Sequence, residues 1–64
     1  MTPTLTDAAL RVIGGVLTIR GRVTGHEDYV DGSAFETAPI QVLDLGERTA
    51  KTKSVTYKIE GEIK

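Results

Sequence analysis

Apolar and polar residues alternate along two stretches of the chain, and this period predicts two half-buried β-strands. In residues 16–24 one face carries Leu17, Ile19 and Val23, whereas the opposite face carries threonines and arginines. Residues 55–64 repeat the alternation. A glycine stands at an inward position of each stretch, so both strands are expected to bend. These glycines are Gly21 and Gly61.

The segment from Leu5 to Ile13 is compatible with two structures. As a helix it would begin after the N-cap Thr6 and end at Gly14. As a strand it would turn through Gly14-Gly15 into the strand that follows. β-Branched residues before the turn and the pairing across it favour the hairpin. The expected pairs are Val12 with Leu17, Leu10 with Ile19 and, on the outer face, Arg11 with Thr18.

A third extended stretch runs over residues 35–45, with Ile40 and Val42 at inward positions. Because Pro39 has no amide hydrogen to donate, it is expected at a strand start, an edge or a bulge.

The following residues predict another hairpin. Residues 44–47 have the composition of a turn, and residues 48–52 form a short strand that returns through Lys53-Ser54 into the last strand. The expected inward pairs are Ala50 with Tyr57 and Thr52 with Val55.

These five strands predict an all-β fold with little or no helix. Five short, twisted strands with glycine bends curl most readily into a small barrel, here an antiparallel β-meander of the SH3-like or OB-like kind. A chain of 64 residues makes a single domain, residues 1–64. The expected core consists of Leu10, Val12, Leu17, Ile19, Val23, Ile40, Val42, Val55, Tyr57, Ile59 and Ile63.

Composition narrows the classes of function. Eight basic and nine acidic residues give a net charge of −1, which argues against a general nucleic-acid or membrane-surface binder. The chain has no cysteine and one histidine, so disulfides, thiolate zinc sites and sites with two imidazoles from one chain are excluded. No apolar run approaches the ~20 residues of a membrane span, and no secretory signal is visible. We expect a cytoplasmic protein.

Small size suggests self-association. A chain of this length buries only about 60% of the surface that its unfolded form exposes, so its stability is marginal. Short strands also leave edges to protect. We therefore expect a homodimer, formed edge to edge by the N-terminal or the final strand.

Residues 25–40, GHEDYVDGSAFETAPI, contain the only histidine, four of the nine acids and the only phenylalanine. A calcium loop would need oxygen ligands where Tyr29 and Ala38 stand. One histidine with carboxylates is a poor zinc set without cysteine. No nucleophile motif surrounds Ser33 or Ser54. We expect no metal, no cofactor and no catalytic residue.

Turn residues within this stretch indicate that residues 25–38 are a recognition loop. Gly25 and Gly32 are expected to shape it, and His26 to brace it through a backbone hydrogen bond. Tyr29 has two possible positions, a lid folded over the barrel end or an exposed interface anchor. Because three acids are not comfortably buried together, we expect a partner to be bound by Glu27, Asp28, Tyr29 and Asp31.

Two blocks of the chain resemble a family of small uncharacterised proteins encoded by bacteriophages and prophages. The first consists of Gly25-His26, Tyr29, Asp31-Gly32, Phe35, Thr37, Pro39-Ile40 and Asp44. The second is residues 52–59, TKSVTYKI, so the resemblance spans about residues 16–60. Glu27 and Ala38 depart from the family pattern, which has proline and serine there. The resemblance implies a phage or prophage accessory protein and gives no catalytic residue.

Three functions are compatible with these observations. The first is a non-enzymatic counter-defence inhibitor, similar to anti-CRISPR proteins, whose acidic loop binds a basic surface of a host protein complex. The second is an oligomeric binder of a small anionic nucleotide. Its phosphates would be held by Arg20, Arg22, Lys51 or Lys53, with Tyr29 or Tyr57 stacking. The third, a single-stranded nucleic-acid module, is the weakest because the net charge is negative.

Overall fold

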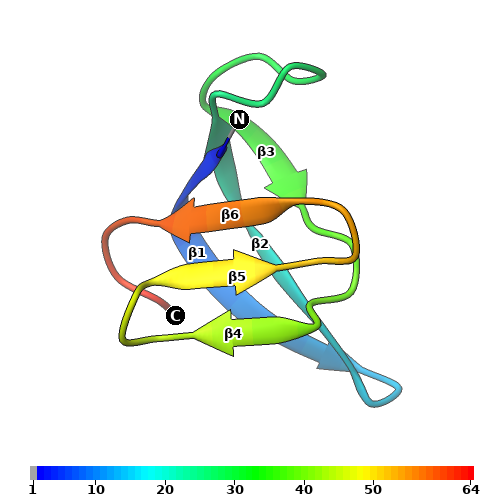
Figure 1. Ribbon diagram of the computed structural model, residues 1–64. Helices are drawn as coiled ribbons and strands as arrows, with labels where there is room; N and C mark the ends of the chain where they lie inside the picture. The colour runs from blue at the N-terminus through cyan, green and yellow to red at the C-terminus, as the bar shows by residue number, and fades with distance from the viewer. Residues whose placement is uncertain (1) are drawn as a thin grey trace.

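The computed structural model describes residues 2–64, and this part of the chain contains six β-strands and no helix (Figure 1). The predicted all-β class is therefore confirmed. No helix in residues 2–64 could cross a membrane. The strands are β1 (Thr4–Ile13), β2 (Val16–Thr24), β3 (Ser33–Glu36), β4 (Val42–Asp44), β5 (Thr49–Lys51) and β6 (Thr56–Ile59).

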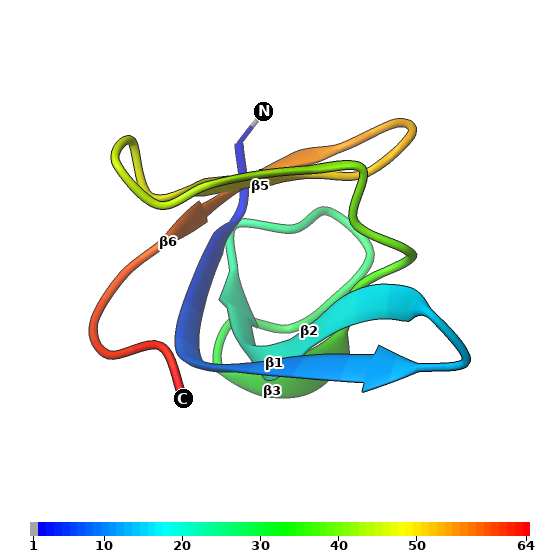
Figure 2. The ribbon, with the colours of Figure 1, turned by 90° about the horizontal axis from the view of Figure 1, so that it is seen from below.

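The six strands form one mixed sheet in the order β3-β2-β1-β6-β5-β4. β1 and β6 pair in parallel, and all other neighbours pair antiparallel. The sheet curls, so that β4, β5 and β6 lie across β1, β2 and β3 (Figures 1 and 2). Its ends, β3 and β4, do not pair with each other. The predicted five-stranded antiparallel barrel is therefore wrong in strand number, strand direction and closure.

The third predicted strand is divided into β3 and β4 because the chain changes its pairing partner between them. The amides of Thr37 and Ile40 donate to carbonyls of β2, at 2.9 and 2.8 Å, whereas the next amide, that of Gln41, donates to Lys51 O on β5 at 2.7 Å. Pro39, which has no amide hydrogen to donate, lies between Thr37 and Ile40. The change of pairing partner follows directly, between Ile40 and Gln41.

The N-terminal hairpin has the predicted register. Val12 pairs with Leu17, Leu10 with Ile19 and Arg11 with Thr18. Gly14 and Gly15 both have positive φ, 60° and 79°, as a two-residue hairpin turn of type I′ requires. The helix that the segment could also have formed does not occur.

Gly21 lies against an irregularity in β1. The register between β1 and β2 shifts between Thr6 and Ala9, and a Cβ atom at position 21 would lie 2.5 Å from Thr6 O. The missing side chain lets the two backbones approach at this point. The bend expected at Gly21 therefore corresponds to a β-bulge in the neighbouring strand.

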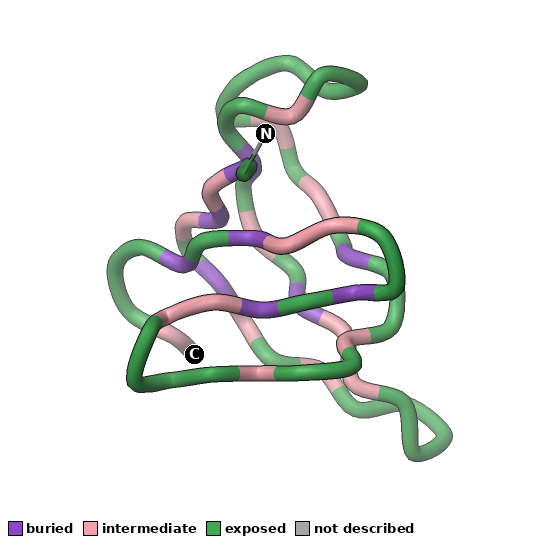
Figure 3. Tube along the Cα trace, in the orientation of Figure 1, coloured by how far each residue is buried: buried purple, intermediate pink, exposed green. Residues whose placement is uncertain are grey.

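The buried hydrophobic residues form one cluster, and buried positions occur on both halves of the sheet (Figure 3). Four predicted core residues are buried, namely Ile19, Val23, Tyr57 and Ile59, and they are joined by Leu5, Ala8 and Ala50. Leu17, Ile40, Val55 and Ile63 are half-buried.

Three core predictions are wrong, for two different reasons. Leu10 and Val12 are exposed because the hairpin tip of β1 and β2 extends beyond the other half of the sheet (Figure 1). Val42 is exposed because the inward-facing position of β4 lies one residue later than predicted. Leu43 packs against the core instead.

The last strand is shorter than the alternation predicts. β6 ends at Ile59, Gly61 has a φ of 77°, and Ile63 forms an isolated parallel bridge with Ala8 of β1. Ala50 pairs with Tyr57 as expected. β1 and β6 lie inside the sheet and β3 and β4 at its edges. The expected homodimer stays a prediction.

Candidate functional site

Residues 25–32 form a loop between β2 and β3 at one end of the molecule (Figure 1). The Gly25 amide donates to Asp31 Oδ1 at 2.9 Å, and the Gly32 amide donates to Val23 O at 2.7 Å. Gly25 and Gly32 have φ values of 80° and 83°, a region that side chains other than glycine rarely adopt. Hydrogen bonds and glycine conformation thus fix both ends of this loop.

His26 braces the loop through its ring. Its Nδ1 atom accepts a hydrogen bond from the Asp28 amide at 3.1 Å. A nitrogen that accepts carries no proton, so the neutral ring bears its hydrogen on Nε2. The backbone also turns inside the loop, because the Tyr29 amide donates to His26 O at 3.3 Å. His26 therefore has a structural contact at one nitrogen.

Every aromatic residue of the chain gathers around this histidine. We call His26, Tyr29, Phe35 and Tyr57 the aromatic cluster. Ring centroids lie 4.9 Å apart for His26 and Tyr29, 4.8 Å for Tyr29 and Phe35, and 5.7 Å for Phe35 and Tyr57. Such tilted and edge-to-face contacts stabilise beyond their buried area. The cluster joins the loop to the core, because Tyr57 of β6 is buried.

The pKa of the Tyr57 hydroxyl is perturbed by its surroundings. Burial of its hydroxyl raises the pKa above the ordinary value, and the nearby charge of an ionised Tyr29 raises it further. Both effects disfavour the phenolate. The hydroxyl of Tyr57 therefore stays protonated at neutral pH.

The outward face of the loop carries acidic and apolar side chains together. Glu27 and Asp28 are exposed, Tyr29 is 47% exposed, and Val30 is 80% exposed. Tyr29 combines the two predicted positions, because its ring packs in the aromatic cluster while half of its surface faces solvent. Asp31 is exposed too, and its carboxylate also holds the Gly25 amide.

A shallow cleft lies beside the loop. It is lined by Glu27, Asp28 and His26 of the loop and by residues of the N-terminal segment and of the connection between β5 and β6, including Pro3 and Ser54. Within residues 2–64 no group of three or more metal-ligating side chains comes together. The cleft therefore places acidic groups next to an imidazole without assembling a metal centre from the described residues.

The four cations considered as phosphate ligands do not come together. Arg20 and Arg22 line a groove on the outer face of β1, β2 and β3. Lys51 belongs to β5, and Lys53 follows it in the turn before β6. The groove instead contains Arg11 and Lys64, neither of which was predicted as a ligand. We call this surface, Arg11, Arg20, Arg22 and Lys64 above Ala9 and Ala34, the basic groove.

One of these missed residues had a signal in the sequence. The predicted hairpin register places Arg11 opposite Thr18 on the outer face, and Arg20 follows Thr18 on the same face. No local pattern indicates Lys64, because the contact between the chain end and β1 depends on the parallel pairing of distant residues.

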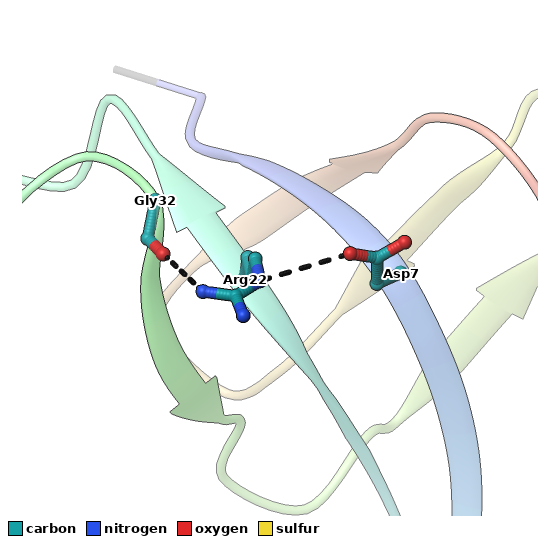
Figure 4. A network of polar contacts seen from close by, with 3 residues as sticks. All are labelled: Asp7, Arg22 and Gly32. Atoms are coloured by element: carbon teal, nitrogen blue, oxygen red, sulfur yellow. Dashed lines mark hydrogen bonds and ion pairs between the residues drawn. The ribbon is translucent and has the colours of Figure 1, made fainter.

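Arg22 connects the basic groove to the loop (Figure 4). Its Nη1 atom donates to Gly32 O at 2.9 Å, and its Nε atom lies 3.7 Å from Asp7 Oδ2. Asp7 stands at the bulge of β1 with a φ of 52°. Both side chains of this ion pair are mostly exposed, so the pair contributes little stability, but it orients the arginine.

Comparison of the chain with protein-family models, with curated proteins and with solved structures gave no match. The resemblance to phage-encoded proteins therefore stays a prediction from the sequence.

Proposed function

We propose that the protein is a non-enzymatic binding module that recognises a basic surface of another protein through residues 27–30. The observation that carries this proposal is the combination of a fixed loop shape with exposed side chains that the fold does not use. Glu27, Asp28 and Val30 are exposed, while hydrogen bonds and the aromatic cluster hold the backbone beneath them.

Preorganisation is the physical reason why such a loop suits recognition. A loop that is ordered before association loses less conformational entropy when it binds. Tyr29 adds a rigid aromatic surface at the centre of the exposed group, and tyrosine is enriched among residues that dominate interface energetics. The two adjacent acids would raise the association rate with a basic partner.

The partner that we propose is a host protein complex with a basic, nucleic-acid-binding groove, and the role is that of a counter-defence inhibitor of the anti-CRISPR kind. Support for the charge of the partner comes from the loop acids, whereas support for the phage context comes only from the sequence resemblance. With that context we also propose that the protein acts in the cytoplasm of a bacterial host cell.

Affinity capture from a bacterial host extract tests this function. Wild-type protein would be compared with Glu27→Lys combined with Asp28→Lys. The control is Glu47→Lys combined with Glu60→Lys, which makes the same change in charge at exposed positions outside the loop. We expect the control to retain a partner that the loop variant loses. Equal recovery by all three proteins would contradict the proposal.

A further inference from the structure

The basic groove lies on the opposite side of the sheet from the hydrophobic core. Arg20 and Arg22 alternate along β2 with the buried residues Ile19 and Val23, so their side chains face outward. Residues Ala9 and Ala34, which pair with the two arginines from the neighbouring strands, are small. The floor between the long cationic side chains is therefore open.

Cations reach the groove from three segments of the chain. β2 contributes Arg20 and Arg22, and β1 contributes Arg11. The chain end contributes Lys64, which is held along β1 by two backbone hydrogen bonds, from the Leu10 amide to Lys64 O at 2.9 Å and from the Lys64 amide to Ala8 O at 2.7 Å. Strand pairing thus fixes the backbone positions of all four cationic residues that line the basic groove.

Carboxylates neutralise this charge only in part. Four cations and two acids, Asp7 and Glu36, line the groove, so the formal charge of its side chains is 4 − 2 = +2. Glu36 accepts a hydrogen bond from Thr18 Oγ1 at 2.8 Å. The single ion pair among residues 2–64 is that of Asp7 with Arg22. Arg11, Arg20 and Lys64 therefore have no carboxylate within 4.0 Å in the described structure, although the whole chain has a net charge of −1.

We propose that the basic groove binds a phosphate-bearing anion, at a site separate from the recognition loop. Guanidinium groups offer paired donors that match the oxygens of a phosphate, and two of them, Arg11 and Arg20, have no competing ion pair. Phe35 also lines the groove, but its ring is engaged in the aromatic cluster. The groove therefore supplies charge and donors but no stacking surface, and its ligand is recognised through phosphate oxygens.

Two probes distinguish the sources of such a phosphate. Amide spectra of isotope-labelled protein would be recorded at low salt with sodium pyrophosphate and, separately, with oligothymidylate of about ten nucleotides. We expect pyrophosphate to shift the amide signals of Ala9, Arg20 and Ala34. A response to the oligonucleotide alone would assign the groove to the backbone of a single strand. No response to either probe would overturn the proposal.

Matched variants locate the binding. Arg11→Gln combined with Arg20→Gln removes two cations from the groove but keeps Arg22, which also holds the loop. Lys53→Gln combined with Lys58→Gln removes two exposed cations elsewhere. We expect the groove variant to bind the responding probe about tenfold more weakly and the control to bind like wild type. The amide spectrum shows whether each variant is folded. If the double groove variant is not folded, Arg20→Gln alone is used in its place. Equal weakening by both pairs would overturn the proposal.

Discussion

The rings of His26 and Tyr29 meet edge to face, with their centroids 4.9 Å apart. One of these residues bonds the loop backbone through Nδ1, and the other presents nearly half of its surface to solvent. The contact thus joins the interior support of the loop to the surface that we propose for recognition.

Two substitutions separate the two contacts of His26. His26→Asn keeps an acceptor that can bond the amide two residues on but loses the ring, whereas His26→Phe keeps the ring and loses the acceptor. We expect each variant to lower the free energy of unfolding by about 0.5–1.5 kcal/mol, measured by urea denaturation. Two variants as stable as wild type would show that His26 does not brace the loop.

Alkaline pH should destabilise the protein through Tyr57. Its pKa is raised in the folded state by burial and by Tyr29, so the folded protein holds this proton more tightly than the unfolded chain does. The resulting stabilisation is complete below about pH 10, the ordinary pKa of tyrosine, and is lost as the pH rises through the raised pKa.

Tyr57→Phe is the control for this effect, because it lacks the titrating hydroxyl. We expect the free energy of unfolding of wild type to fall more steeply than that of Tyr57→Phe between about pH 9 and pH 11. Parallel curves for the two proteins would exclude Tyr57 as the group responsible.

The close approach at Gly21 predicts that an added methyl group destabilises the protein at this position but not at Gly46. A Cβ atom at position 21 would lie 2.5 Å from Thr6 O, whereas one at Gly46 would lie at an ordinary 3.4 Å from Asp44 Oδ1. Gly21→Ala should destabilise the protein by about 1–3 kcal/mol, and Gly46→Ala should change stability little. A thermal melt in which both variants match wild type would contradict the close packing of β1 on β2.

Local features of the fold could be predicted from the sequence because they depend on neighbouring residues. The register of the first hairpin follows from the two glycines and the apolar pairs beside them. The inward positions of Ile19, Tyr57 and Ile59 follow from strict alternation.

Long-range features could not be predicted in this way. The parallel pairing of Leu5 with Ile59 depends on how the whole sheet curls, and the alternation of apolar and polar residues within a strand does not indicate it. For the same reason the burial of Leu5 and Ala8 was missed. In the loop, the residue types of His26 and Gly25 indicated a compact turn, but the aromatic cluster needs Tyr57 from the far end of the chain.

The tip of the first hairpin supports our expectation of a homodimer, by a contact other than the one predicted. Val12 and Ile13 are 69% and 62% exposed there, and exposed apolar groups favour association. Light scattering at micromolar concentration should give twice the mass of one chain. Val12→Thr with Ile13→Thr should shift the protein toward a monomer, and Val30→Thr, at the other end of the molecule, should not. A wild-type monomer would contradict this expectation.

The central claim is that the loop acids contact a basic partner, and titration calorimetry with the captured partner tests it most directly. Affinities would be measured in low and high salt for wild type, for Glu27→Lys with Asp28→Lys, and for Glu47→Lys with Glu60→Lys. Because exposed charges are screened by salt, we expect the loop variant to lose at least about tenfold in affinity at low salt, less at high salt, and more than the control variant in both. Equal affinities of the loop variant and the control at both salt concentrations would contradict the claim.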